Sequence, residues 1–352
     1  MKMKRLVVLL SVILLVTALV TGCGKTESDK KEPGKTETGQ TETGKTDSES
    51  AKTGLAVITG LSKSTDAGTD PGLAQVDSTV VAVLVDNSGK ILDCVIDSVQ
   101  SKINFDSSGK LITPIDTLFP TKNELGKDYG MHKASGIGKE WNEQAAALAE
   151  YVKGKTVNEI KSIAVDGSGH PTGSDLKASV TISISGYIDA IEKAVAQAQE
   201  LGASTSDKLG LGIITNMSHS VDAGDDPGLA EAYSTYVVIT QDSGGKITSC
   251  IIDASQGKVN FDKSGKITSD IQASVKTKNE LGKDYGMAKA SSIGKEWYEQ
   301  AAAFAQYVTG KTPAEVASIA VDEDGKATDS DLLASVTVSI DGFKEALAKA
   351  AR

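Results

Sequence analysis

The sequence predicts an α+β protein with two tandem copies of one domain, each a small antiparallel sheet followed by helices. Three observations lead to this prediction. The chain matches itself without a gap at an offset of 156 residues. Each copy begins with runs rich in β-branched residues that are separated by turns ending in Gly-Lys. The later part of each copy changes to helical spacing with helix-capping signals, and strands followed by helices are typical of the α+β class.

The self-match defines the predicted domains. It begins with Leu55 and Leu211, reaches the C-terminus, and more than half of its positions are identical; residues 121–131 recur unchanged at 277–287. A period of this length suits a whole domain and exceeds the repeat of a solenoid. We therefore expect a first repeat domain at 54–200, a linker at 201–210 and a second repeat domain at 211–352.

Alternating and β-branched residues predict the strands of the first copy. Residues 78–85 and 91–96 flank an Asp-Asn-Ser-Gly-Lys turn, which predicts a hairpin. A similar turn separates 103–105 from 111–113 and predicts a second, shorter pair of strands. Residues 175–184 also alternate between polar and apolar, so we expect a strand there.

Capping signals and apolar spacing predict the helices. Residues 121–124 and 156–159 have the capping-box pattern, and Pro313 stands at the first helical position of the second copy's equivalent. Apolar residues at helical spacing predict further helices over 137–152 and 187–198.

The N-terminus indicates export. A basic start and an uncharged apolar run over 6–20 predict a signal peptide at 1–22. Small residues leading to Cys23 resemble the lipobox of bacterial lipoproteins, which implies lipidation of Cys23, an extracytoplasmic location and a lipid anchor in the cell membrane. The alternative is an uncleaved anchor. Residues 24–53 lack aromatic and large aliphatic side chains and predict a disordered tether with a reach of about 30 Å.

Composition limits the partners and the chemistry. The chain has 37 basic and 47 acidic residues, a net charge of −10, and no basic cluster with interleaved aromatics, so we expect no nucleic-acid partner. Beyond Cys23, each copy has one cysteine, Cys94 or Cys250, in strand-like sequence; we expect buried thiols and no metal site, with a Cys94–Cys250 disulfide as the alternative.

The two copies serve as an internal comparison. His132, His170 and His219 are matched by Ala288, Lys326 and Lys63, so no histidine chemistry is common to both copies. Because no nucleophile and base pair is shared either, we predict no catalytic residues, and the sequence favours a binding or electron-carrier protein over an enzyme.

Shared aromatic residues are the candidates for contacting a ligand. Tyr129 and Trp141 recur as Tyr285 and Trp297, and either ligand stacking or core packing explains them. Glu140 with Glu143 is a candidate acid and base pair or part of a solvated helix face. Polar residues shared after the second strand form another group: Asp97, Gln100, Lys102 and Asn104.

A late segment of each copy carries a family resemblance. Residues 175–181 read Asp-Leu-Lys-Ala-Ser-Val-Thr, and 331–337 read Asp-Leu-Leu-Ala-Ser-Val-Thr. With the preceding order of elements, this spacing resembles the FMN-binding domain, whose threonine is esterified to the FMN phosphate. The resemblance implies FMN as a cofactor and a cofactor-binding role for Asp175, Thr181, Asp331 and Thr337. The motif is degenerate, because Ala-Ser-Val replaces the family's Ser-Gly-Ala.

Two functions therefore follow from the sequence. The first is an anchored extracytoplasmic lipoprotein with FMN-binding-like domains that binds a ligand or transfers electrons outside the cell. The alternative is a non-redox module at the cell surface, without a cofactor, that binds an unknown small ligand or a surface protein. A hydrolase ranks last.

Overall fold

The computed structural model describes residues 49–352, which lie within one compact unit. The predicted signal peptide, Cys23 and nearly all of the predicted tether lie outside the described residues. Within the described residues, no helix has the length and apolar character needed to cross a membrane.

Each copy forms a three-stranded antiparallel sheet in which neighbouring strands are consecutive along the chain. The strands of the first copy are β1 (Lys52–Gly60), β2 (Gly72–Val85) and β3 (Ile91–Phe105). Those of the second copy are β4 (Lys208–Asn216), β5 (Gly228–Gln241) and β6 (Ile247–Phe261). Helices follow each sheet, so the predicted α+β class with two tandem sheet-and-helix copies is confirmed.

The hairpin predicted over 78–96 is present but longer than expected. The strand β3 continues to Phe105 and so includes the separately predicted segment 103–105, while 111–113 contributes only a bridge between Leu111 and Phe105. The edge strand β1 was not anticipated; its first residues, Lys52 and Thr53, fall in the segment that the sequence suggested as tether.

Each copy contains two longer helices, of 10 to 12 residues, and several short ones. The first copy contains α1 (Lys122–Leu125), the 3₁₀ helix η1 (Gly126–Tyr129), α2 (Trp141–Val152), α3 (Val157–Lys161), α4 (Ser174–Lys177) and α5 (Ser185–Ala196). The second contains α6 (Lys278–Leu281), η2 (Gly282–Tyr285), α7 (Trp297–Val308), α8 (Pro313–Ala317), α9 (Ser330–Leu333) and α10 (Asp341–Ala350). The capping boxes predicted at Thr121 and Thr156 both form, and Pro313 begins α8.

The strand predicted over 175–184 is wrong. The segment starts as α4, and the N–H of Val180 then donates to the carbonyl of Leu176. Its buried side chains Leu176, Val180 and Ile184 are spaced by four residues, which fits a helical turn as well as an alternating strand. The helix predicted from Ile137 begins only at Trp141, because Gly138 has a φ of 62° that interrupts the helical backbone.

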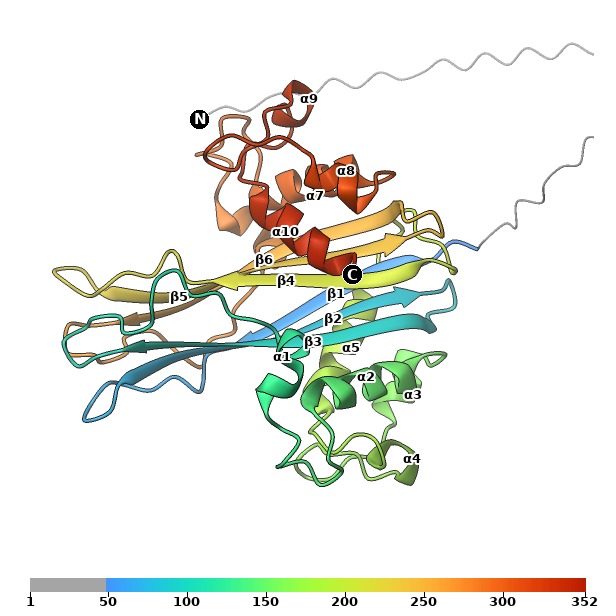
Figure 1. The fold of residues 1–352 in the computed structure, drawn as a ribbon, viewed down its shortest axis with the longest axis horizontal. Coiled ribbons are helices and arrows are strands. Elements are labelled where there is room, and N and C mark those ends of the chain that lie inside the picture. Colours follow the sequence, from blue (N-terminus) through green and yellow to red (C-terminus); the bar gives the residue numbers. More distant parts are fainter. Residues whose placement is uncertain (1–48) are drawn as a thin grey trace, which may run out of the picture. The chain divides into compact units, whose positions relative to one another are not determined.

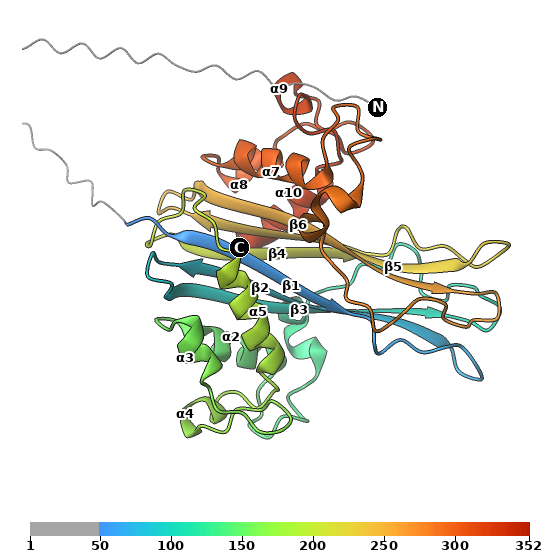
Figure 2. The same cartoon turned by 180° about the vertical axis from the view of Figure 1, so that it is seen from behind.

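The two copies stack as four layers. In Figures 1 and 2 the two sheets lie face to face, and the helices of each copy cover the outer face of its own sheet. Each copy thus has a core between its sheet and its helices, centred on Trp141 and Leu148 in the first copy and on Trp297 and Phe304 in the second. Two further apolar clusters contain residues of both copies and lie between the sheets.

Reciprocal contacts join the two sheets. Phe105 and Phe261, which occupy equivalent positions, stack with ring centroids 4.2 Å apart. The N–H of Ala67 donates to the carbonyl of Gly265 and that of Ala223 to the carbonyl of Gly109, each at 2.8 Å. The copies are therefore related by an approximate two-fold arrangement, and the inner face of each sheet is buried by the other.

Both remaining cysteines are free and buried. Cys94 and Cys250 have free thiols with no disulfide between them, and each residue is 5% exposed. Burial raises the pKa of both thiols, which keeps them protonated and unreactive at neutral pH.

Candidate functional site

A buried lysine surrounded by aromatic rings marks the candidate site of the second copy. Lys278 is 4% exposed, and its ammonium nitrogen lies 4.7 Å from the ring centres of Tyr233 and Tyr285 and 4.8 Å from that of Trp297. The same nitrogen donates a hydrogen bond of 2.8 Å to the Tyr233 hydroxyl. The negative faces of aromatic rings attract a cation at such distances. This group of four residues is called the lysine cage below.

Local structure places the members of the lysine cage. Lys278 is the first residue of α6, whose start is fixed by the reciprocal capping bonds of Thr277 and Glu280. Tyr285 ends η2, and Trp297 is the first residue of α7. These short elements bring three positions that are close in sequence onto the outer face of the sheet. Tyr233 comes from β5, more than forty residues earlier.

Burial shifts the charge states in and beside the lysine cage. It lowers the pKa of Lys278 to about 8, although Glu231 and Asp253 act in the opposite direction. It raises the pKa of Asp253 to about 6, against the hydrogen bonds from Thr277, Asn279 and Ala254 that favour the carboxylate. At neutral pH the ammonium therefore retains its charge in a largely apolar surrounding.

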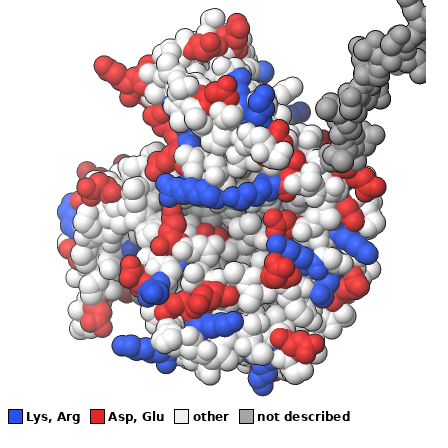
Figure 3. Space-filling model, turned by 45° about the vertical axis from the view of Figure 1, so that its right-hand side comes forward, with Lys and Arg blue, Asp and Glu red and all other residues white. Residues whose placement is uncertain are grey.

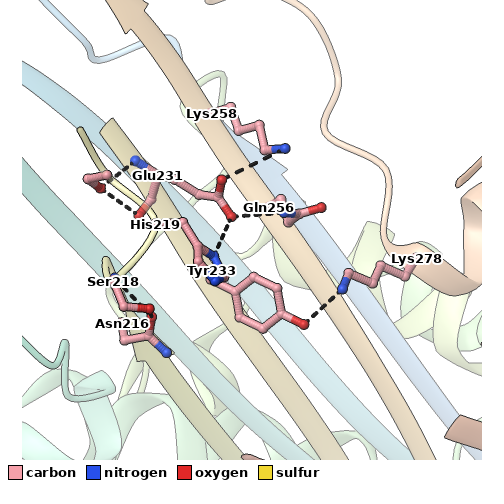
Figure 4. Close-up of polar contacts among 9 residues, drawn as sticks. Asn216, Ser218, His219, Glu231, Tyr233, Gln256, Lys258 and Lys278 are labelled. Atoms are coloured by element: carbon pink, nitrogen blue, oxygen red, sulfur yellow. Dashed lines mark hydrogen bonds and ion pairs between the residues drawn. The ribbon is translucent and has the colours of Figure 1, made fainter. Parts of the chain in front are cut away.

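Beside the lysine cage, the buried side chain of Glu231 contacts polar side chains from β6 and from the loop that follows β4 (Figure 4). The carboxylate of Glu231 accepts a hydrogen bond of 2.9 Å from the amide of Gln256, and Lys258 lies 3.8 Å away. The Nδ1 atom of His219 is 3.3 Å from the same carboxylate, and the His219 ring meets the Tyr233 ring edge-on. Cross-strand pairing of β5 with β6 sets Glu231 opposite Lys258 and Tyr233 opposite Gln256.

An open pocket of about 550 Å³ adjoins both groups. Its volume lies within the range of small-molecule sites. Three lysines and two aspartates border it together with Tyr285, and one of its residues, Leu61, comes from the first copy. The complete lining is Leu61, Gln256, Lys258, Asp270, Ala273, Ser274, Val275, Lys276, Lys278, Leu281, Asp284 and Tyr285.

On the side seen in Figure 3, the charged side chains do not gather into a large patch of one sign. Basic and acidic side chains are interspersed across that face, and uncharged residues separate them. A charged ligand would therefore respond chiefly to side chains within a few ångströms, since charges beyond about 10 Å are screened in salt solution.

The first copy has a reduced form of the same arrangement. Lys122 lies 4.7 Å from the ring centre of Tyr129 and 5.0 Å from that of Trp141. Asp77 replaces Tyr233 and is held by Lys63 at 2.8 Å and by the amide of Gln75 at 2.9 Å. Although burial opposes it, these hydrogen bonds lower the pKa of Asp77. The strand of the first copy thus provides a paired carboxylate where that of the second provides an aromatic ring.

The structure brings the predicted aromatic residues together. Tyr129 with Trp141, and Tyr285 with Trp297, each flank the equivalent lysine. Both tryptophans are also buried core residues, at 2% and 3% exposure, so core packing and contact with a polar site coincide. The lysine itself was not singled out from the sequence, although it stands in the longest identical block of the two copies.

The threonines and the aspartates of the FMN-like motif have different surroundings. The Thr181 hydroxyl donates to the side-chain carbonyl of Gln144 at 3.2 Å, and Thr337 repeats this bond with Gln300 at 3.1 Å. Both glutamines are fully buried, so they tie the segment to α2 and α7. The aspartates of the motif are exposed residues of the short helices α4 and α9: Asp175 and Asp331.

Glu140 and Glu143 stabilise the start of α2. The Glu140 carboxylate accepts from the N–H of Met131 at 2.8 Å, and the N–H of Glu140 donates to the Glu143 carboxylate at 2.8 Å. They form the capping box of α2. Within residues 49–352 no three His, Cys, Asp or Glu side chains gather as a metal site would require.

Comparisons with known proteins give one partial similarity. Over 94 residues the chain is 35% identical to a chlorophenol reductase of Desulfitobacterium hafniense, a match that covers 24% of this chain and 29% of that protein. The chain thus spans less than a third of that relative's length. No described protein family matches the chain. No solved structure matches it either.

Proposed function

We propose that this protein is a lipid-anchored binding protein, displayed outside the cytoplasm, whose second copy holds a small anionic aromatic ligand without a covalent bond. The observation that carries the proposal is the lysine cage at the edge of an open pocket. An anion at the pocket would pair with a cation that is poorly solvated, which strengthens the attraction. An aromatic ligand would also find the Tyr285 ring for stacking.

Flavin mononucleotide is the ligand that the sequence favours, because the FMN-like spacing recurs in both copies. Its ring system is planar and its phosphate is anionic, and Lys258 and Lys276 add positive charge to the pocket lining. The Thr337 hydroxyl is engaged with Gln300, which favours reversible binding over an ester bond.

Electron transfer outside the cell is the second candidate function. The partial similarity to a protein named chlorophenol reductase favours it, since reduction requires a carrier of electrons. A bound flavin would supply the redox chemistry, while this chain would bind and orient it. Reduction of the bound flavin by membranes of the native host would support this candidate over simple ligand binding.

Titration of the mature lipoprotein in detergent with FMN and with riboflavin tests the proposal. We expect FMN fluorescence to be quenched on binding, and riboflavin to bind more weakly because it lacks the phosphate. The variant Lys278→Met should weaken FMN binding about tenfold or more, as loss of a desolvated charged partner does. Lys122→Met in the first copy is the matched control and should leave the affinity unchanged. Absence of FMN binding by the wild-type chain would refute the flavin proposal.

The pH dependence of binding supplies an independent check. Lys278 has a pKa of about 8, so its positive charge is lost as the pH rises through that value. Affinity for FMN should therefore fall progressively as the pH rises from about 7 to about 9. A flat profile to pH 9.5 would remove Lys278 from the site.

The anchor can be tested separately from the ligand. Labelled palmitate should enter the wild-type chain, and Cys23→Ala should abolish both the labelling and the retention in the membrane fraction. Unchanged membrane retention of Cys23→Ala would favour an uncleaved apolar anchor.

A further inference from the structure

We infer that the first copy completes the ligand site of the second: Lys193 is a positioning residue for Lys278 that acts through Glu280, and Leu61 forms part of the pocket wall. The inference rests on the proposed function for its binding readout. It goes further because it assigns roles to residues that belong to the opposite repeat.

Lys193 lies in the last turn of α5 and reaches across to the second copy. Its ammonium nitrogen is 2.6 Å from Oε1 of Glu280 and donates at 2.6 Å to the carbonyl of Val57 in its own sheet. Both charged side chains are about three-quarters buried. Burial opposes ionisation of Glu280, but the hydrogen bonds from Lys193 and Thr277 prevail and lower its pKa. The pair is therefore ionised and sheltered from solvent.

Glu280 connects this ion pair to the lysine cage. Its Oε2 atom accepts from the N–H of Thr277 at 2.9 Å, while its own N–H donates to the Thr277 hydroxyl at 3.2 Å. These two bonds form the capping box that starts α6, and Lys278 is the first residue of that helix. Oε2 of Glu280 therefore fixes the start of α6, while Oε1 binds Lys193 and holds α6 to the first copy.

The pocket wall supplies a second contact between the copies. Leu61 follows β1 and is 4% exposed, yet it borders the pocket of the second copy. Two residues earlier, Thr59 forms an antiparallel bridge with Val275, which also lines the pocket. The loop before α6 is therefore held against the edge of the first sheet.

The reverse contact offers a matched control. Lys349 of α10 is 2.5 Å from Oε1 of Glu124, which forms the capping box of α1 with Thr121, and Lys349 donates at 3.1 Å to the carbonyl of Ile213. Loss of Lys349 removes an equivalent ion pair between the copies but affects the helix that presents Lys122. Any effect of Lys193 on the second site can thus be separated from a general loosening of the interface.

The experiment compares Lys193→Met with Lys349→Met in the mature chain. Melting temperatures should fall by similar amounts in the two variants, whereas FMN affinity should fall about threefold to fivefold in Lys193→Met alone, the range of a partly exposed ion pair. Leu61→Ala should also weaken FMN binding. Equal binding losses in the two lysine variants, or an affinity of Lys193→Met within the error of the wild-type value, would overturn the inference.

A readout without ligand keeps this inference distinct from the proposed function. The rate at which Lys278 and Lys122 react with an amine-modifying reagent can be followed by mass spectrometry. Lys278 should react faster in Lys193→Met, and Lys122 faster in Lys349→Met. If the wild-type chain binds no FMN but this crossed pattern appears, the flavin proposal fails and the positioning role stands. If both lysines respond equally in both variants, the positioning role fails.

Discussion

The two repeats share a scaffold but differ at the lysine that each presents. Both start the short helix with the same capping box and place a tyrosine and a tryptophan beside the lysine. In the second copy a third ring, Tyr233, encloses the ammonium and accepts its hydrogen bond. In the first copy Asp77 occupies the equivalent strand position and is already paired with Lys63.

This difference separates the features that both copies share from those that only the second copy has. Features present in both copies, such as the capping boxes, the buried glutamines and the tryptophans, maintain the fold. Three residues found only in the second copy, Glu231, Tyr233 and His219, contact one another or the pocket residues Gln256 and Lys278. The scaffold is thus common to both copies, while the third ring beside the lysine and the buried glutamate belong to the second copy.

The largest effect should come from the buried tryptophans, which the comparison assigns to the fold. Trp141→Ala and Trp297→Ala should each reduce the free energy of unfolding by about 3–5 kcal/mol, because each removes a large core side chain. Urea denaturation measures the change. A much smaller loss in one copy would show that its tryptophan serves the site more than the core.

The buried aspartates at the sheet should affect the pH dependence of stability equally in both copies. Burial raises the pKa of Asp97 and of Asp253 from 3.8 to about 6, so between these values the folded state binds more protons than the unfolded state. Stability should therefore fall as the pH rises through about 6, by about 1–3 kcal/mol for each residue. Asp97→Asn and Asp253→Asn should each flatten this dependence, as measured by melting temperature between pH 4 and 7. If only one of the two variants changed the pH dependence of the melting temperature, the two aspartates would not be equivalent.

Tyr233 and Asp77 occupy equivalent positions in the two copies and can be exchanged. Tyr233→Asp removes one ring of the lysine cage and places a carboxylate near Lys278, so FMN affinity should fall about tenfold, a cost of about 1.4 kcal/mol. Asp77→Tyr is the reverse exchange and should leave binding by the second copy unchanged. Retained affinity in Tyr233→Asp would show that the Tyr233 ring does not contribute to FMN binding.

The smallest effect concerns a hydrogen bond present only in the first copy. The Trp141 Nε1–H donates to the Tyr187 hydroxyl at 3.1 Å, whereas the equivalent partner of Trp297 is Phe343. Tyr187→Phe should cost about 1 kcal/mol in the free energy of unfolding. Tyr151→Phe is the control, because its hydroxyl has no hydrogen bond within the described residues. Equal values for the two variants would mean that the bond contributes nothing measurable.

Local sequence signals predicted much of the fold and part of the site. The capping boxes at Thr121 and Thr156 were readable because their bonds join residues three positions apart. The strand predicted over 175–184 failed because spacing by four residues is compatible with both periods. Comparing the copies residue by residue identified the shared aromatic residues Tyr129, Trp141, Tyr285 and Trp297. The same comparison excluded His219 and could not identify Glu231 or Tyr233, because the first copy has different residues at these positions.

Matching the sequence to itself was enough to show that one domain occurs twice and which residues the copies share. A sheet followed by capped helices could also be predicted, because turns, capping boxes and apolar spacing depend on neighbours a few positions apart. Only the tertiary structure decided that the sheets bury their inner faces against each other and that Lys193 reaches Glu280. The strands β2 and β5 are buried almost along their whole length. Such a strand needs cover on both faces, but its sequence does not state which element covers it.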